Sequence, residues 1–148
     1  MTFTIRQLAK EDRPGWEHLW AGYLDFYQAP MEPAVSEVTW SRLLNPEEPM
    51  QALVAEDDAT HELIGLVHCV FHRGTWAIGD FCYLEDLFVA RSARNRGVGR
   101  ALIEAVYALA DTRKCERVYW LTHETNTTAR ALYDQIARRS GFIHYRRP

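Results

Sequence analysis

The sequence lacks the hydrophobic segments that carry a chain into or across a membrane. None of its apolar runs approaches the ~20 residues of a membrane-spanning helix. The first residues, Met1 to Arg6, have neither the basic region nor the apolar region of a signal peptide. These absences argue against a membrane protein or a secreted protein, so we expect a cytoplasmic location and no membrane partner.

Cysteine is scarce, and its spacing does not suit disulfides or metal binding. The chain has an odd number of cysteines and no Cys-x-x-Cys pair: Cys69, Cys82 and Cys115. Reduced thiols in the core are therefore the favoured interpretation. The segment that begins at His123 lacks the second histidine of a zinc-binding helix, and His68 and His72 fall in or at the end of a predicted strand. We interpret these as ordinary histidines and predict no metal site.

Basic residues form no continuous stripe with interleaved aromatics, which disfavours nucleic acid as a partner. The net charge of −3 is nevertheless unevenly divided. Residues 1–62 hold 12 acids and 4 bases, whereas residues 63–148 hold 8 acids and 13 bases. An acidic half could concentrate a cationic substrate, and a basic half suits an anionic cofactor. Ordinary solvated surface charge explains the same division equally well.

Linkers, internal repeats and low-complexity tracts are also missing. A chain of 148 residues suits one domain and buries roughly two thirds of the surface that it exposes when unfolded. Hydrophobic residues make up 47% of the chain and charged residues 25%, which is typical of soluble globular proteins and argues against disorder. We therefore expect a single domain over residues 1–148.

The order of predicted elements indicates a mixed sheet. Apolar runs and turn residues predict strands over 3–8, 51–56, 62–71, 81–89, 117–122 and 142–145. Helical spacing predicts helices after Pro14, over 36–44, from Val98 and from Ala129, the last stopping near Gly141. The order strand, helix, strand, helix, strand from residue 81 onward implies parallel pairing on an otherwise antiparallel sheet.

Glycine and arginine are concentrated in the segment after the strand 81–89. Its sequence is Arg94-Asn95-Arg96-Gly97-Val98-Gly99-Arg100. The two glycines permit unusual backbone angles, and the segment opens a helix whose unpaired N–H groups would attract an anion such as a pyrophosphate. It is not a P-loop, which needs Gly-Lys-Ser/Thr, nor a dinucleotide fingerprint, which needs Gly or Ala where Leu102 stands. A plain surface turn is the structural alternative.

Two stretches together carry a resemblance to a known family. They are Tyr83–Val89 followed by Arg94-x-x-Gly97-x-Gly99, and Asn126 with Ala129–Tyr133 and Gly141-Phe142. The first resembles the acetyl-coenzyme A motif of the GNAT superfamily of N-acetyltransferases. With the second, the chain is most similar to diamine and polyamine acetyltransferases and their histone-acetyltransferase-like relatives. The resemblance implies an α/β (α+β) GNAT fold, with a mixed central sheet of six to seven strands and about four helices.

The resemblance also implies acetyl-CoA as the cofactor and assigns its contacts by position. The backbone of Leu87, Phe88 and Val89 would pair with the pantetheine arm. The segment from Arg94 to Arg100 would hold the pyrophosphate. Further cofactor contacts would come from Asn126, Ala129 and Tyr133. The family's second C-terminal strand has little room after Phe142, so the partner in an expected homodimer could complete the substrate site.

By the same resemblance, Glu85 would accept the proton of the attacking ammonium, directly or through water. Tyr133 would be the general acid that protonates the departing thiolate. The residue types suit these roles, because a carboxylate in an apolar strand can have a raised pKa and a phenol can supply a proton. Asp86 is the alternative base, but strand side chains alternate faces, so Glu85 and Asp86 should not both point into one cleft. A core position for Tyr133 and an arginine partner for Glu85 are the structural alternatives.

Candidate acceptor-binding residues are Asp25, Tyr27 and Glu32, near the turn after the first helix, together with Glu85 and Asp86. A solvated helix end explains the first three more simply. We hypothesise an acetyl-CoA-dependent N-acetyltransferase that acts on a primary amine of a small cationic acceptor, with polyamines and diamines first. The alternatives are a lysine-rich protein tail or an aminoglycoside as acceptor, and a non-catalytic acyl-CoA binding module.

Overall fold

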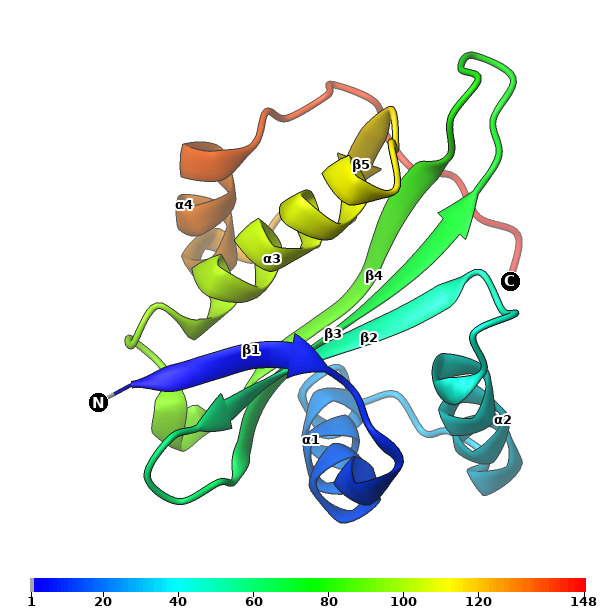
Figure 1. Ribbon diagram of the computed structural model, residues 1–148. Coiled ribbons are helices and arrows are strands. Elements are labelled where there is room, and N and C mark those ends of the chain that lie inside the picture. Colours follow the sequence, from blue (N-terminus) through cyan, green and yellow to red (C-terminus); the bar gives the residue numbers. More distant parts are fainter. Residues whose placement is uncertain (1) are drawn as a thin grey trace.

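Five strands form one sheet at the centre of the structure, a computed structural model that describes residues 2–148. Their order in the sheet is the same as their order in the chain. The strands are β1 (Phe3–Gln7), β2 (Met50–Asp57), β3 (Leu63–His72), β4 (Phe81–Val89) and β5 (Arg117–Tyr119). The first four pair antiparallel and β5 joins β4 in parallel, as the element order predicted (Figure 1).

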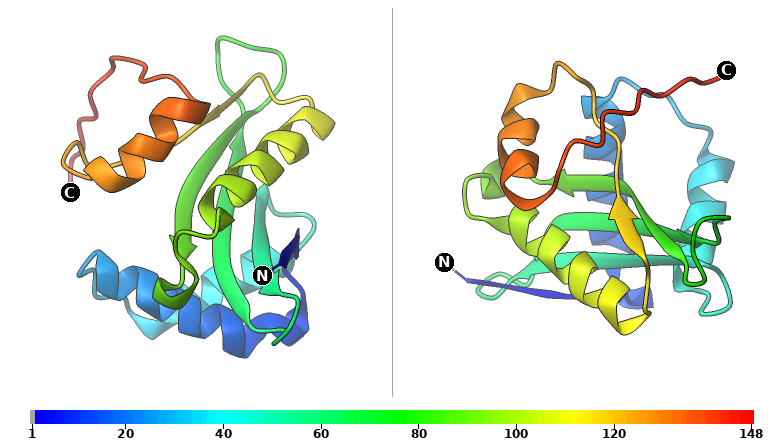
Figure 2. Two further views of the ribbon diagram at one scale, coloured as in Figure 1. Left: turned by 90° about the vertical axis from the view of Figure 1, so that its left-hand side faces the viewer. Right: turned by 90° about the horizontal axis from the view of Figure 1, so that it is seen from above.

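Four helices of the described chain flank the sheet, α1 and α2 on one side and α3 and α4 on the other (Figures 1 and 2). They are α1 (Arg13–Phe26), α2 (Pro33–Leu44), α3 (Val98–Thr112) and α4 (Thr127–Ile136), with 3-10 turns η1 (Lys10–Asp12) and η2 (Arg91–Ala93). Prolines stand in the first turns of α1 and α2, where a missing backbone N–H removes no hydrogen bond. α2 therefore begins at Pro33, three residues before the predicted start.

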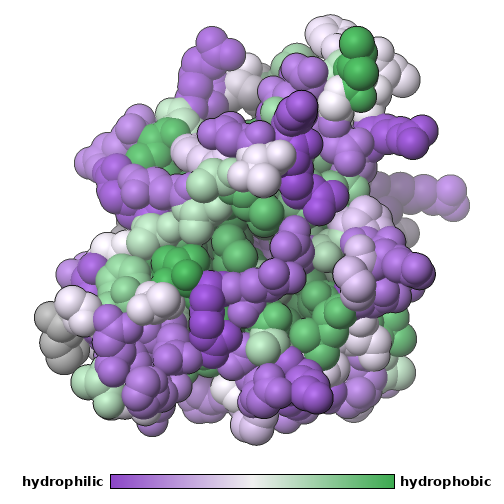
Figure 3. Space-filling view, in the orientation of Figure 1, coloured by the Kyte–Doolittle hydropathy of each residue, from purple (hydrophilic) through white to green (hydrophobic). Residues whose placement is uncertain are grey.

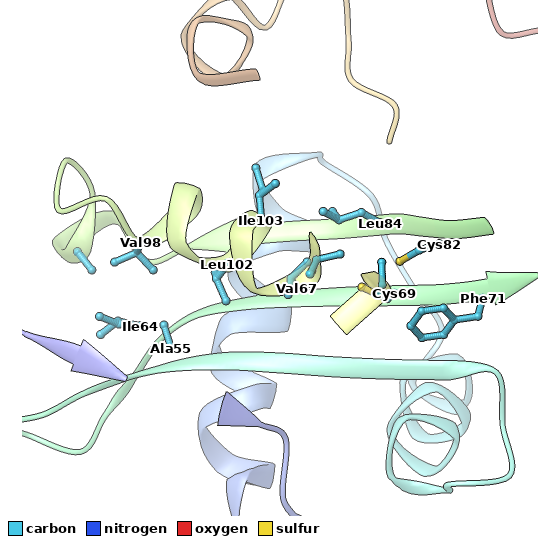
Figure 4. Packing of buried hydrophobic residues seen from close by; sticks show 13 residues of the cluster. Ala55, Ile64, Val67, Cys69, Phe71, Cys82, Leu84, Val98, Leu102 and Ile103 are labelled. Atoms are coloured by element: carbon cyan, nitrogen blue, oxygen red, sulfur yellow. The ribbon is translucent and has the colours of Figure 1, made fainter. Parts of the chain in front are cut away.

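The central strand β3 is buried on both faces, and its sequence is accordingly an almost continuous apolar run. On the α3 side, Val67 and Cys69 pack in one cluster with Leu102 and Ile103 (Figure 4). On the α1 side, Leu66 packs among the tryptophans of α1 and α2. Because strand side chains alternate faces, one apolar run supplies two cores.

The mixed sheet and four helices are confirmed, but the sheet has five strands in place of six to seven. The predicted strand 142–145 is wrong: this segment is irregular, and Phe142, Ile143 and Tyr145 are 91%, 74% and 85% exposed. β5 also ends at Tyr119 rather than at residue 122. Alternating apolar residues make a strand only where a neighbouring strand supplies hydrogen bonds, and a β5 of three residues offers almost none.

Apolar side chains also reach the surface. On the face seen in Figure 3 they form a band across the middle of the molecule, between more hydrophilic regions. Trp76 and Ile78, on the turn between β3 and β4, are exposed as well. In residues 2–148, no helix combines the length and the apolarity that crossing a bilayer requires. Cys69 and Cys82 are buried in the core as free thiols, and the free thiol of Cys115 is half-buried.

Candidate active site

A wedge opens in the sheet where the two parallel strands part. β5 pairs with β4 only as far as the Tyr83–Tyr119 pair, whose rings stack with centroids 5.0 Å apart. β4 continues beyond this point to Val89, while the chain leaves β5 for the loop before α4. Along this stretch the edge of β4 that faces β5 pairs with no strand of residues 2–148. Its backbone N–H and C=O groups can therefore bond a ligand that lies along the strand.

A large cleft of about 1600 Å³ extends from this wedge. Its lining includes Tyr23 of α1 and Tyr27, the residue that follows this helix. β4 contributes Glu85 and Asp86, and α4 contributes Tyr133. The end of α1 and the loop after β5 meet across the cleft, where the rings of Tyr27 and His123 have centroids 6.1 Å apart. The structure thus brings the predicted base, its alternative and the predicted acid to one cavity.

A β-bulge decides how the two carboxylates of β4 are placed. His68 on β3 pairs with Asp86, but the next residue, Cys69, pairs with Leu84. Glu85 is therefore an extra residue in β4, with no partner of its own on β3. A bulge sets aside the strict alternation of side chains. Both Glu85 and Asp86 line the cleft, so the expectation that they could not share one was wrong.

Glu85 is free to act on a ligand. Among residues 2–148, no arginine or other side chain forms an ion pair or hydrogen bond with it, so an arginine partner is not its role here. Burial in the cleft wall raises the pKa of the Glu85 carboxyl, and the neighbouring charge of Asp86 raises it further. A raised pKa makes this carboxylate a stronger base.

Asp86, by contrast, is held by its neighbours. His68 Nδ1 lies 2.9 Å from Asp86 Oδ2, and the indole N–H of Trp16 donates to His68 Nε2 at 3.0 Å. His68 and Trp16 are 2% and 0% exposed. Sequence reasoning assigned neither residue to the site. The available signal was that His68 interrupts the apolar run of β3, just as Glu85 and Asp86 interrupt that of β4.

Tyr133 lies half-buried on α4, edge-on to the ring of Trp120 with centroids 5.3 Å apart. Its ring packs against the core, and its side chain also lines the cleft. Burial raises the pKa of the Tyr133 phenol, and the nearby Tyr27 adds a smaller effect in the same direction. The phenol is therefore protonated at neutral pH and can donate a proton.

The segment from Arg94 to Arg100, called the cradle below, leads into the start of α3. Gly97 precedes the helix with a φ of +80°, in the left-handed region that favours glycine, and no side chain caps the helix. The first intrahelical bond runs from Ala101 N–H to Gly97 C=O at 3.0 Å. The N–H groups of Val98, Gly99 and Arg100 consequently have no helical acceptor. Such groups bind phosphate oxygens well.

The three arginines of this cradle differ in what they contact. The guanidinium of Arg96 donates to Asp57 Oδ2 at 3.1 Å and ties the cradle to β2. Arg100 contacts Gln135 on α4 and Glu104 one turn along α3. Arg94 is exposed, with a single long contact of 3.4 Å from Nε to the carbonyl of Val89. Arg94 is thus the side chain most available to an anion.

The remaining predicted residues fall at varied distances from the cleft. Asn126 precedes the first residue of α4, where its Nδ2 approaches Thr122 Oγ1 at 3.4 Å, and Ala129 is half-buried in the first turn. Asp25 and Glu32 are exposed and do not line the cleft with Glu85. Every acid that lines the cleft comes from residues 63–148. The structure therefore favours ordinary surface charge as the meaning of the acidic first half.

The sequence model of the acetyltransferase (GNAT) family matches residues 6–137, most of the chain. This chain is a member of the GNAT acetyltransferase family. It is 34% identical to the D-amino-acid N-acetyltransferase HPA3 of Saccharomyces cerevisiae, over 97% of this chain and 89% of that protein. It is 30% identical to the uncharacterised N-acetyltransferase YhfO of Bacillus subtilis, over 95% of this chain and 94% of that protein.

The fold is shared with solved structures of distant sequence. AAC(6′)-Iy, in complex with a bisubstrate analogue that contains CoA, matches with a TM-score of 0.85 at 19% identity, over 100% of this chain and 99% of that one. The GNAT chain is thus an acyltransferase enzyme that uses acetyl-CoA. In the part of the chain that the structure describes, no three His, Cys, Asp or Glu side chains are grouped to hold a metal ion.

Proposed function

We propose that this enzyme transfers an acetyl group to the primary amine of a small cationic acceptor bound in the cleft beside β4. The observation that carries the proposal is the meeting of Glu85, Asp86 and Tyr133 in one cleft, next to the unpaired edge of β4. A base, an anion for the ammonium and a proton donor are the groups that acetylation of an amine requires. We also propose that residues 1–148 act as one domain.

The chain's own groups fit acetyl-CoA, which supplies an acetyl group activated as a thioester. The uncapped N–H groups at the start of α3 and the exposed Arg94 would hold the pyrophosphate. The free backbone edge of β4 at Leu87–Val89 would bond the pantetheine arm. Because Arg96 is engaged by Asp57, it would act mainly by fixing the shape of the cradle.

Glu85 would act as the base. A primary amine with a pKa near that of lysine, about 10.4, is almost wholly protonated at neutral pH and cannot attack until it loses a proton. Glu85 would take that proton directly or through one water, since no side chain of residues 2–148 is bonded to it and its pKa is raised. Asp86 is the weaker candidate, because one of its oxygens is already bonded to His68.

Tyr133 would supply the proton at the other end of the reaction. The amine nitrogen forms a bond to the acetyl carbon, the carbon–sulfur bond breaks, and the sulfur leaves with the bonding electrons. The phenol of Tyr133 would then donate its proton to that sulfur. Its raised pKa keeps the proton on the oxygen until it is needed.

The cleft suits a cationic acceptor. Its wall combines the carboxylates of Glu85 and Asp86 with the rings of Tyr23, Tyr27 and Tyr83, and both kinds of group attract ammonium ions. Polyamines and diamines fit this description. Amino acids are the second candidate, because the HPA3 enzyme acts on D-amino acids and arginines that also line the cleft could hold a carboxylate.

Release of free CoA thiol from acetyl-CoA tests the proposal. Putrescine, spermidine, spermine, D- and L-lysine, D-alanine, a histone-tail peptide and an aminoglycoside would be offered in turn, with acetyl-CoA binding measured by calorimetry in the same samples. Release driven by one small amine supports the proposal and identifies the acceptor class. Release with the peptide alone would replace it by protein acetylation. Binding without any release would favour the non-catalytic acyl-CoA module.

A further inference from the structure

The bonds of His68 determine which ring nitrogen carries its proton. The indole N–H of Trp16 can only donate a hydrogen bond, so His68 Nε2, 3.0 Å away, must accept it. The single ring proton of the neutral imidazole therefore sits on Nδ1. From there it donates to Asp86 Oδ2 at 2.9 Å. The two hydrogen bonds that join Trp16, His68 and Asp86 thus run in one direction, with each donor on the core side and each acceptor toward the wall of the cleft.

This direction fixes the ring of His68. A proton on Nε2 in place of Nδ1 would point at the indole N–H, and both donors would be buried without an acceptor. The rings of Trp16 and Trp20 pack beside the imidazole, with centroids 6.1 and 5.1 Å away, and Asp86 accepts the hydrogen bond from Nδ1. Asp86 is therefore the acidic group at the end of this series of hydrogen bonds.

The consequence for Asp86 is a carboxylate whose position is fixed. Its side chain is 15% exposed, and that exposed part lies in the cleft beside Glu85. No arginine or lysine of residues 2–148 forms an ion pair with Asp86. A partly buried carboxylate without a permanent counter-ion attracts a cation strongly, because few waters screen it.

We propose that Trp16 and His68 are positioning residues that hold Asp86 as an anion against the cleft, where Asp86 binds the ammonium group of the acceptor and leaves Glu85 to take its proton. This inference rests on the proposed acetyl transfer to a cationic amine. It assigns different roles to two adjacent carboxylates. Asp86 is held by His68 and binds the ammonium group, whereas Glu85 is not held in this way and accepts the proton.

The first test is His68→Leu, which removes both hydrogen bonds and keeps a buried side chain. The KM for the best amine of the panel should rise about tenfold, equivalent to ~1.4 kcal/mol of binding. The KM for acetyl-CoA should stay within about twofold, because the hydrogen-bond partners of His68 are Trp16 and Asp86, and neither lies in the cradle. His68→Gln should restore most of the lost affinity, since its amide oxygen can accept from Trp16 and its amide N–H can donate to Asp86.

The second test is Trp16→Phe, which removes the indole N–H and leaves His68 Nε2 without its donor. The imidazole is then no longer held in one orientation, so its hydrogen bond fixes Asp86 less firmly. The amine KM should therefore rise about threefold or more, while kcat changes less. Trp40→Phe is the matched control: Trp40 is buried against Trp16, does not contact His68 by a hydrogen bond, and should leave the amine KM unchanged.

The outcomes separate this inference from the proposed function. No turnover of any amine by the wild type would overturn the proposed function itself. Turnover by the wild type, with an unchanged amine KM in folded His68→Leu, would overturn the positioning role. An amine KM in folded Trp16→Phe that is no higher than in Trp40→Phe, or equal loss in His68→Leu and His68→Gln, would also overturn it. Circular dichroism melts would show that each variant compared is folded.

Discussion

Replacing Tyr133 with phenylalanine removes one hydroxyl from the cleft and little else. The ring would keep its edge-on contact with Trp120 and its place against the core cluster of α3. A volume-conserving exchange of this kind costs less than about 1.5 kcal/mol in stability. The variant should therefore fold and bind acetyl-CoA with an affinity close to that of the wild type. Any large loss of rate can then be assigned to the missing hydroxyl.

The size of the expected loss follows from the leaving group. General acid catalysis typically contributes about 10²- to 10⁴-fold in rate. A thiol has a pKa near 8.5, so a thiolate leaves more easily than an alkoxide and needs less help from an acid. We therefore expect the low end of the range for Tyr133→Phe, roughly a 100-fold fall in kcat, or ~2.7 kcal/mol in the barrier.

The pH dependence of kcat provides a second test of the role of Tyr133. A general acid works only below its own pKa, and burial raises the pKa of Tyr133 above the ordinary value of 10.0. The wild-type kcat should stay constant until strongly alkaline pH and fall only as the phenol of Tyr133 ionises. In Tyr133→Phe this alkaline fall should disappear, because the group that titrates is gone. Release of CoA thiol at saturating acceptor measures kcat at each pH.

Tyr107→Phe is the matched control for this prediction. Tyr107 also lines the cleft, and its hydroxyl donates to the carbonyl of Ile136 at 2.8 Å. Removing that hydroxyl should lower stability slightly and leave kcat within about threefold of the wild type. If Tyr133→Phe turned over as fast as Tyr107→Phe, Tyr133 would have no part in proton transfer, and the proton would have to reach the sulfur from water.

Three further predictions concern the base, the cradle and the core. Glu85→Gln should lower kcat at neutral pH by at least about 100-fold and abolish the fall in wild-type rate as the pH drops through the raised pKa of Glu85, both measured by thiol release. Gly97→Ala should cost about 1–2 kcal/mol in thermal melts, because φ is +80°, and should weaken acetyl-CoA binding in calorimetry. Asp12→Asn should lower stability in urea by roughly 1.5–3 kcal/mol at neutral pH, because hydrogen bonds from Arg6 depress the Asp12 pKa.

Each of these predictions has an outcome that would contradict it. If the rate of Glu85→Gln still fell at low pH as the wild-type rate does, the base would be another group. Gly99→Ala introduces a Cβ with ordinary contacts inside a helix, so equal destabilisation by Gly97→Ala and Gly99→Ala would refute the backbone argument. The stability that Asp12 contributes is present above pH ~4 and lost as the pH falls through its depressed folded pKa. The gap between wild type and Asp12→Asn should therefore close in acid, and a constant gap would exclude the ionic cause.

The sequence alone determined the parts of this protein that depend on near neighbours along the chain. The bounds of β4, the start of α3 at Val98 and the left-handed glycine before it are read from apolar periodicity and from glycine itself. These features are local, because each depends on a residue's own backbone or on one turn of helix. The GNAT family and its cofactor followed from the same short segments, whereas the role of the cradle residues stays a prediction. The homodimer and the cytoplasmic location stay predictions.

Only the tertiary structure decided how the carboxylates of Glu85 and Asp86 are placed. The bulge that turns both Glu85 and Asp86 into one cleft is a property of the pairing between β3 and β4, and it has no signature within β4. Trp16 meets His68 across 52 residues of sequence, and His68 meets Asp86 across 18. The irregular C-terminal segment is the converse case, since its alternating residues have the pattern of a strand without a partner. The free energy of strand pairing depends on two segments at once, so it cannot be predicted from the sequence of either segment alone.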